Sequence, residues 1–198
     1  QIKTIFETSP NIVVRVPEEC GTLKEAVKKV HEDNCLTTIV VGAGEYQIGM
    51  YLNISSALNI VGDLGSAKEE IVVVGGIYFM SGIQGNCHLQ HLTLRQAKEY
   101  GVYGMSSFTM DDVLVEQCRY DGVLANGIGV VGRCSNVEVR QCGWSGVSAA
   151  NGASITLVGA ETTVHHNCTN GRSDDYGLDV VGSSSSTIQL VSPLTKEQ

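Results

Sequence analysis

Proline, aromatic residues and long apolar runs are all scarce in this sequence. Only 3 of the 198 residues are proline and 6% are aromatic, and no apolar run approaches the length of a membrane-spanning helix. Basic residues are scattered, apart from Lys28-Lys29, and the net charge is −8. Neither phosphate backbones nor anionic lipids attract such a chain, so we expect no nucleic-acid partner and no membrane partner. Nothing at the N-terminus resembles a signal peptide.

Paired cysteine motifs are also missing. The cysteine count is seven, an odd number, with no CxxC and no Cys/His spacing typical of a zinc site. Cys118 and Cys142 recur at the same place in successive repeats, which favours buried, reduced thiols over disulfides or redox chemistry. We therefore expect an intracellular, reducing compartment, no metal and no cofactor.

Glycine is abundant, at 23 residues, and marks the turns of an internal repeat. Short alternating segments start 21, 24 and 25 residues apart, at Leu92–Leu94, Val113–Val115, Val137–Val139 and Thr162–Val164. Each is followed by a turn residue and then a glycine: Ala97 and Gly101, Cys118 and Gly122, Cys142 and Gly146, and, after a six-residue insertion, Asn167 and Gly177. This period predicts a solenoid whose glycines adopt backbone conformations barred to other residues.

One helix is predicted before the repeats. Thr22 and Glu25 form a capping box, and Leu23, Ala26, Val27 and Val30 give a single apolar stripe. We expect this helix to cap the first coil. The chain then divides into residues 1–36 (strand and capping helix), 37–191 (coils) and 192–198 (tail) of one domain covering 1–198.

The opening of the chain resembles the pectin-lyase-like β-helix proteins. The resemblance is carried by Val13–Pro17, Gly21–Val27, Ile39–Tyr46 and Leu58–Asp63, while Val137–Val147 is similar to the repeat of carbohydrate-binding and sugar-hydrolase β-helices. It implies an all-β, single-stranded, right-handed parallel β-helix of about six or seven coils. The superfamily mixes enzymes with non-catalytic scaffolds, so the fold does not fix the function.

The motifs of the superfamily's best-known enzymes are absent from this sequence. The calcium ligands and arginine of pectate lyases, the three aspartates and Gly-His-Gly of polygalacturonases, and the Asp-Phe-x-Phe-Gly of pectin methylesterases have no counterpart. We therefore expect a non-catalytic module or scaffold that presents a long face to a glycan or a protein. The alternative is a polysaccharide lyase or glycoside hydrolase with a diverged site.

That alternative site would use His165, His166, Asp174 and Asp175. The aspartates lie in the inserted loop, and such loops often line a site. Adjacent strand residues point to opposite sides, so the two histidines are not expected to share a metal. Exposed polar residues are the simpler interpretation. We treat His88 and His91 as surface or turn residues, and Asp111-Asp112 as a solvated pair.

Two columns of side chains recur across the repeats. Arg95, Glu116, Arg140 and His165 predict an exposed salt-bridge ladder. Tyr100, Tyr120, Trp144 and Tyr176 precede the turn glycines and predict a row of rings about 5 Å apart. The row is either a sugar-binding platform or an aromatic stack that covers the turn. No amphipathic helix follows Ser183, so self-association through the C-terminal coil is a further expectation.

Overall fold

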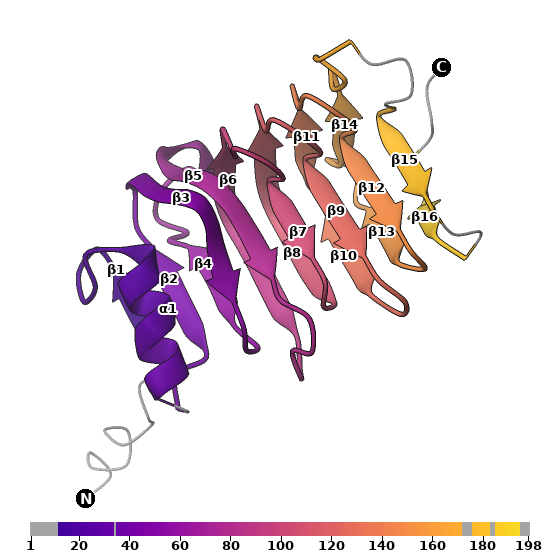
Figure 1. Cartoon of the computed structure of the whole chain (residues 1–198). Coiled ribbons are helices and arrows are strands. Elements are labelled where there is room, and N and C mark those ends of the chain that lie inside the picture. Colours follow the sequence, from indigo (N-terminus) through magenta and orange to yellow (C-terminus); the bar gives the residue numbers. More distant parts are fainter. Residues whose placement is uncertain (1–11, 34, 172–175, 183–184, 195–198) are drawn as a thin grey trace, which may run out of the picture.

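The computed structural model describes residues 12–33, 35–171, 176–182 and 185–194. The chain is an all-β parallel β-solenoid of about six turns, in which successive coils stack along one axis (Figure 1). Each coil contributes to three parallel sheets, and every strand pairing recorded is parallel.

The three sheets share four long strands, which bend around a corner from one sheet to the next: β3 (Gly44–Ile54), β5 (Ile71–Phe79), β6 (Cys87–Arg95) and β8 (Phe108–Glu116). The first sheet also contains β1 (Val13–Val16), β2 (Thr38–Val41), β4 (Asn59–Gly62), β10 (Val131–Ser135), β13 (Ser154–Val158) and β16 (Thr187–Leu190). The second adds β11 (Glu138–Arg140) and β14 (Thr163–His165). The third adds β7 (Val102–Gly104), β9 (Val123–Asn126), β12 (Val147–Ala150) and β15 (Leu178–Val181).

Left-handed residues turn the chain at the two sharp corners of the coil. The corner between the first and second sheets holds His91, Asp112 and Asn136, with φ of 53°, 52° and 50°. The corner after the second sheet holds Gln96, Gln117, Gln141 and His166, with φ between 52° and 57°. The side-chain amide of Gln96 donates a hydrogen bond to that of Gln117, which in turn donates to that of Gln141. These bonds link three successive coils. These residues are polar, so they tolerate both the solvent and the corner conformation.

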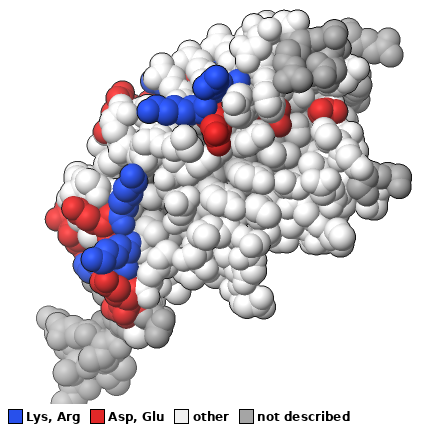
Figure 2. Space-filling view, viewed as in Figure 1, with Lys and Arg blue, Asp and Glu red and all other residues white. Residues whose placement is uncertain are grey.

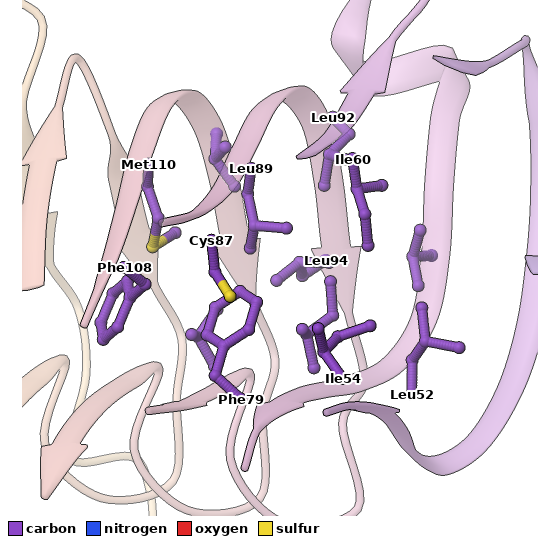
Figure 3. Packing of buried hydrophobic residues seen from close by; sticks show 14 of the residues in the cluster. Leu52, Ile54, Ile60, Phe79, Cys87, Leu89, Leu92, Leu94, Phe108 and Met110 are labelled. Carbon is purple, nitrogen blue, oxygen red and sulfur yellow. The ribbon is translucent and has the colours of Figure 1, made fainter. Parts of the chain in front are cut away.

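Apolar side chains from all three sheets fill the interior. Figure 3 shows Leu52, Ile54, Leu89 and Leu94 directed into the space that the ribbons enclose, with Phe79 and Phe108 beside them. The rings of Phe79 and Phe108 are stacked, with centroids 5.6 Å apart. The flanking apolar residues of the repeated segments point inward as predicted, with Leu92, Leu94, Val113, Val115, Val137 and Val139 all buried. One continuous core therefore joins the coils into a single unit.

The prediction about the turn glycines is wrong. Gly101, Gly122 and Gly146 have no positive φ, so left-handed backbone is not the reason for glycine there. A Cβ on Gly101 would lie 2.5 Å from Cγ1 of Val115 and 2.6 Å from the carbonyl oxygen of Gly122, both in the next coil. Glycine is required because the next coil packs directly against the backbone at this position.

The turn column beside these glycines matches its prediction. Cys118 and Cys142 are buried, and no disulfide joins any of the seven cysteines, all of which lie in the described ranges. Asn167 occupies the same slot one coil later. Its Oδ1 accepts a hydrogen bond from the Cys142 N–H, and its Nδ2 donates to the Val139 carbonyl, both at 3.0 Å. The asparagine thus satisfies backbone groups that the bend removes from the ladder.

The single α-helix of the described residues is α1 (Leu23–Glu32), and a short 3-10 helix, η1, spans Lys68–Glu70. Thr22 and Glu25 form the predicted capping box, with both hydrogen bonds 3.2 Å long. Leu23, Ala26, Val27 and Val30 are buried, and the helix contacts β1, β2 and β3. Among the described residues, no helix has the length and apolar character needed to cross a bilayer.

Candidate functional site

The predicted salt-bridge ladder exists, and its centre is buried rather than exposed. The Glu116 side chain is only 5% exposed; its two oxygens accept from Arg95 Nε at 2.6 Å and Arg140 Nη2 at 2.8 Å. Arg140 also binds Glu138, which in turn binds His165 Nε2 at 3.2 Å. Burial opposes ionisation of Glu116, but the bonds to the two arginines outweigh it and lower the pKa of this carboxyl. The ladder links β6, β8, β11 and β14 and is structural.

The prediction that the His165 and His166 rings point to opposite sides is wrong. Their Nδ1 atoms lie 2.6 Å apart. Strand alternation ends at His165, because His166 follows β14 in a left-handed conformation with φ of 52°. Asp174 and Asp175 lie outside the described residues, so their position relative to the histidines stays a prediction. Within the described ranges, no group of three or more His, Cys, Asp or Glu side chains is arranged to hold a metal ion.

His91 and Asp112 form an ion pair that the sequence pattern did not indicate. His91 Nδ1 lies 2.6 Å from Asp112 Oδ2, His91 Nε2 lies 2.9 Å from the Ser66 carbonyl, and Lys68 Nζ lies 2.6 Å from Asp112 Oδ1. Both ring nitrogens face acceptors, so only the imidazolium form donates both hydrogen bonds. The Asp111-Asp112 pair is therefore not a merely solvated turn. His88 also has a partner, with Nδ1 2.7 Å from Thr109 Oγ1.

The His91–Asp112 ion pair makes the stability of the folded protein depend on pH. Burial alone would lower the pKa of His91, but the hydrogen bonds to Ser66 and Asp112 and the Asp112 charge outweigh it and raise the pKa. A raised folded-state pKa adds stability that is complete below the unfolded value of about 6.5 and is lost as pH rises through the folded value. We expect His91→Asn to lower the melting temperature more at about pH 5.5 than at about pH 8.

Thermal unfolding at both pH values checks this prediction. Asparagine is chosen because Asn136 occupies the same corner two coils later with a φ of 50°. His31→Asn on exposed α1 is the matched control histidine. Equal destabilisation of His91→Asn at the two pH values would contradict the assignment of a charged His91.

Three of the four predicted aromatic residues are in ring contact, and three further tyrosines join them. Tyr120 and Trp144 are stacked with centroids 4.1 Å apart, and Tyr100 lies 5.4 Å from Tyr120. Centroid distances of 5.0 to 5.8 Å connect Tyr100 to the rest of this aromatic ladder, which comprises Tyr51, Tyr78, Tyr103, Tyr100, Tyr120 and Trp144. No ring contact joins Tyr176 to the ladder among the described residues. Tyr78 and Tyr103 do not precede the turn glycines of the repeat, so the repeat pattern did not predict their place in the ladder.

A recess of about 540 Å³ lies beside the end of the ladder. Its lining includes Tyr100, Asp121, Trp144, Ser148 and Asp179. Tyr103, Leu124, Ser148 and Asp179 are successive partners in the register of the third sheet, so Tyr103 of the ladder lies in one row with three residues that line the recess. Burial, together with the nearby Asp121 charge, raises the pKa of Tyr100 to about 12, and its phenol stays protonated at neutral pH.

Two features of the recess bear on what it could bind. The Oγ of Ser148 is the one buried side-chain nitrogen or oxygen of the described residues without a hydrogen-bond partner. An unpaired buried hydroxyl costs about 1–3 kcal/mol. The described residues of the lining also include two carboxylates, Asp121 and Asp179, and no Lys or Arg. Figure 2 shows Lys and Arg gathered near the helix and along one border, with the broad face between them nearly free of charge.

A second hollow, of about 630 Å³, opens at the C-terminal coil. Its lining is mixed: it includes the apolar Leu157, Val164, Leu178 and Leu190 together with His165 and Tyr176. Within the described residues, no strand pairs with the outer edges of β14, β15 and β16. The hollow is thus the open end of the core, and self-association through it stays a prediction.

The chain matches no family model and no curated protein. The solved structures that resemble it include the catalytic domain of a GH87 α-1,3-glucanase in complex with nigerose (15% identity, TM-score 0.54) and Escherichia coli YbhC (13% identity, TM-score 0.51). The likeness covers 92% and 95% of this chain, but only 39% of the glucanase chain and 69% of YbhC. The likeness therefore shows a parallel β-helix fold.

Proposed function

We propose that this chain is a non-catalytic glycan-binding β-helix whose ligand lies on the aromatic ladder. The observation that carries the proposal is the run of six rings, two of which, Tyr100 and Trp144, line a recess that also contains two carboxylates. Aromatic side chains offer apolar surface to the C–H faces of sugar rings, and tyrosine adds a polar tip. The recess volume of about 540 Å³ is in the range of small-molecule sites.

One fold neighbour supports a glycan over other elongated ligands. The glucanase that resembles this chain is described with bound nigerose, a neutral sugar. We assign binding without turnover because the known lyase, polygalacturonase and esterase motifs are absent from this sequence. The His165 ring already bonds Glu138 of the ion-pair ladder, which favours a structural role for this candidate of the catalytic alternative.

The test is a titration of Trp144, the only tryptophan, with neutral oligosaccharides that include nigerose. We expect a saturable change in its fluorescence. Trp144→Ala should weaken binding at least about tenfold in calorimetry, which corresponds to about 1.4 kcal/mol. Tyr176→Ala is the control, since Tyr176 lies outside the ladder, and we expect its affinity to stay within about twofold of wild type.

A flat fluorescence response across neutral, acidic and amino oligosaccharides would reject glycan binding and favour a protein-binding scaffold. Release of reducing ends or unsaturated products on prolonged incubation would instead reject the non-catalytic assignment. The two failures are distinct because the first concerns occupancy of the ladder and the second concerns chemistry on a bound ligand.

We also propose that α1 caps the N-terminal end of the solenoid. Its buried stripe of Leu23, Ala26, Val27 and Val30 contacts the strands of the first coil, and its opposite face is exposed. A helix in this position covers apolar side chains that the next coil would otherwise cover.

A further inference from the structure

We propose that His165 and His166 together bind one divalent transition-metal ion, of the kind that prefers imidazole ligands, at the corner that follows β14. Imidazole nitrogen suits Ni²⁺, Cu²⁺ and Zn²⁺ in proteins. The two histidines belong neither to the aromatic ladder nor to the recess beside it. The proposed metal site is therefore independent of the proposed glycan binding.

The convergence of two ring nitrogens is the first reason to place an ion there. The sequence argument against a shared metal assumed that strand alternation separates the two rings, but His166 has a φ of 52° and strand β14 ends at His165. The two Nδ1 atoms lie 2.6 Å apart, and the ring planes are inclined by 84°. Two imidazole nitrogens that each bind one ion at about 2.1 Å, at a right angle, lie roughly 3 Å apart. A small separation of the rings therefore admits the ion, and the His165 side chain is 38% exposed to solvent.

The contact between His165 and Glu138 is the second reason. Glu138 Oε1 accepts a hydrogen bond from Arg140 Nη1 at 2.8 Å and lies 3.2 Å from His165 Nε2. A carboxylate only accepts, so Nε2 carries a proton and the neutral ring has its lone pair on Nδ1, the atom that faces His166. Metal-bound histidines usually donate their other ring N–H to a carboxylate or carbonyl, which orients the ring. When the ion binds, the proton on His166 Nδ1 moves through water to Nε2 of the same ring, which frees the second lone pair.

The charges around the pair do not oppose a cation. Arg140 is the partner of His165 in the register of β11 and β14, but its guanidinium is paired with both Glu116 and Glu138. The described residues contain no metal site with three or more protein ligands. The ion would therefore be held by two imidazoles, and water would fill its other coordination positions.

Titration of the wild-type protein with Ni²⁺ tests the position of the site. The chain has five histidines, and NMR signals of their rings report which of them hold the ion, because paramagnetic Ni²⁺ broadens the signals of its ligands. We expect Ni²⁺ below one equivalent to broaden the signals of His165 and His166 and to leave those of His31, His88 and His91 sharp. Broadening of all five to the same extent, or of none at one equivalent, would overturn the proposal.

Two variants test the residues, with the Ni²⁺ affinity measured by calorimetry. His166→Asn should weaken binding at least about tenfold, and asparagine tolerates the left-handed backbone of this position. Glu138→Gln should weaken binding about tenfold through the orientation of His165, without touching the ion. His31→Asn on exposed α1 is the control and should stay within about twofold of wild type. Unchanged affinity in His166→Asn would reject the site, and unchanged affinity in Glu138→Gln would reject the orienting role of the carboxylate.

Discussion

Gly122→Ala is expected to destabilise the protein by about 3 kcal/mol or more, although alanine is only one methyl group larger. A Cβ at this position would collide with Cγ1 of Val139 and lie 2.7 Å from the carbonyl oxygen of Gly146. The valine belongs to the core, and the oxygen accepts the hydrogen bond of Val123 N–H, so neither can move without separating two coils. Chemical denaturation, followed by the circular dichroism of the strands, measures the effect.

Gly177→Ala is the matched control for this prediction. Gly177 holds the same place one coil after Gly146, and a Cβ there would meet no atom of the described residues within 4 Å. We expect a change within about 0.5 kcal/mol, or a small gain from lower entropy of the unfolded chain. A similar loss of stability in Gly122→Ala and Gly177→Ala would contradict the packing explanation. The backbone conformation would then be the reason for glycine at this turn.

These two glycines also show how far the sequence predicts the fold. The repeat period and the alternating apolar pairs were sufficient to predict a parallel solenoid with an N-terminal helix, because a β-helix coil repeats its inward and outward positions at regular spacing. The reason for glycine at the turn was not predictable in the same way. Positive φ and close packing both select glycine, and only the position of Val139 in the next coil distinguishes them.

The site was less predictable than the fold, for a related reason. Tyr100, Tyr120 and Trp144 each lie one or two residues before the turn glycine of their repeat and were therefore found from the sequence. The recess is built from residues of different repeat positions, and Ser148 and Asp121 have no distinguishing neighbours in the sequence. His91 was missed because its partners Ser66 and Asp112 are 25 and 21 residues away and lie on opposite sides of it in the chain.

Glu116→Gln is expected to cost about 2–3 kcal/mol at neutral pH. The substitution keeps the shape of a buried side chain but removes the charge that holds Arg95 and Arg140. Breaking a fully buried ion pair costs about 3–5 kcal/mol, and we expect less here because the two arginines are 32% and 35% exposed and recover part of their hydration. Glu138→Gln, at the 29% exposed end of the same ladder, should cost under about 1 kcal/mol.

The pH dependence of Glu116→Gln separates the charge from the shape of the side chain. A carboxyl whose pKa is lowered by folding adds stability above its unfolded pKa of about 4.3, and this stability is lost as pH falls through the lower folded value. The difference between wild type and variant should therefore be largest at neutral pH and shrink below about pH 4. A constant difference from pH 7 down to acid unfolding would mean that packing, not charge, makes Glu116 important. In that case the ion pairs of Glu116 would be a consequence of the pairing between β8 and β11 and would not stabilise it.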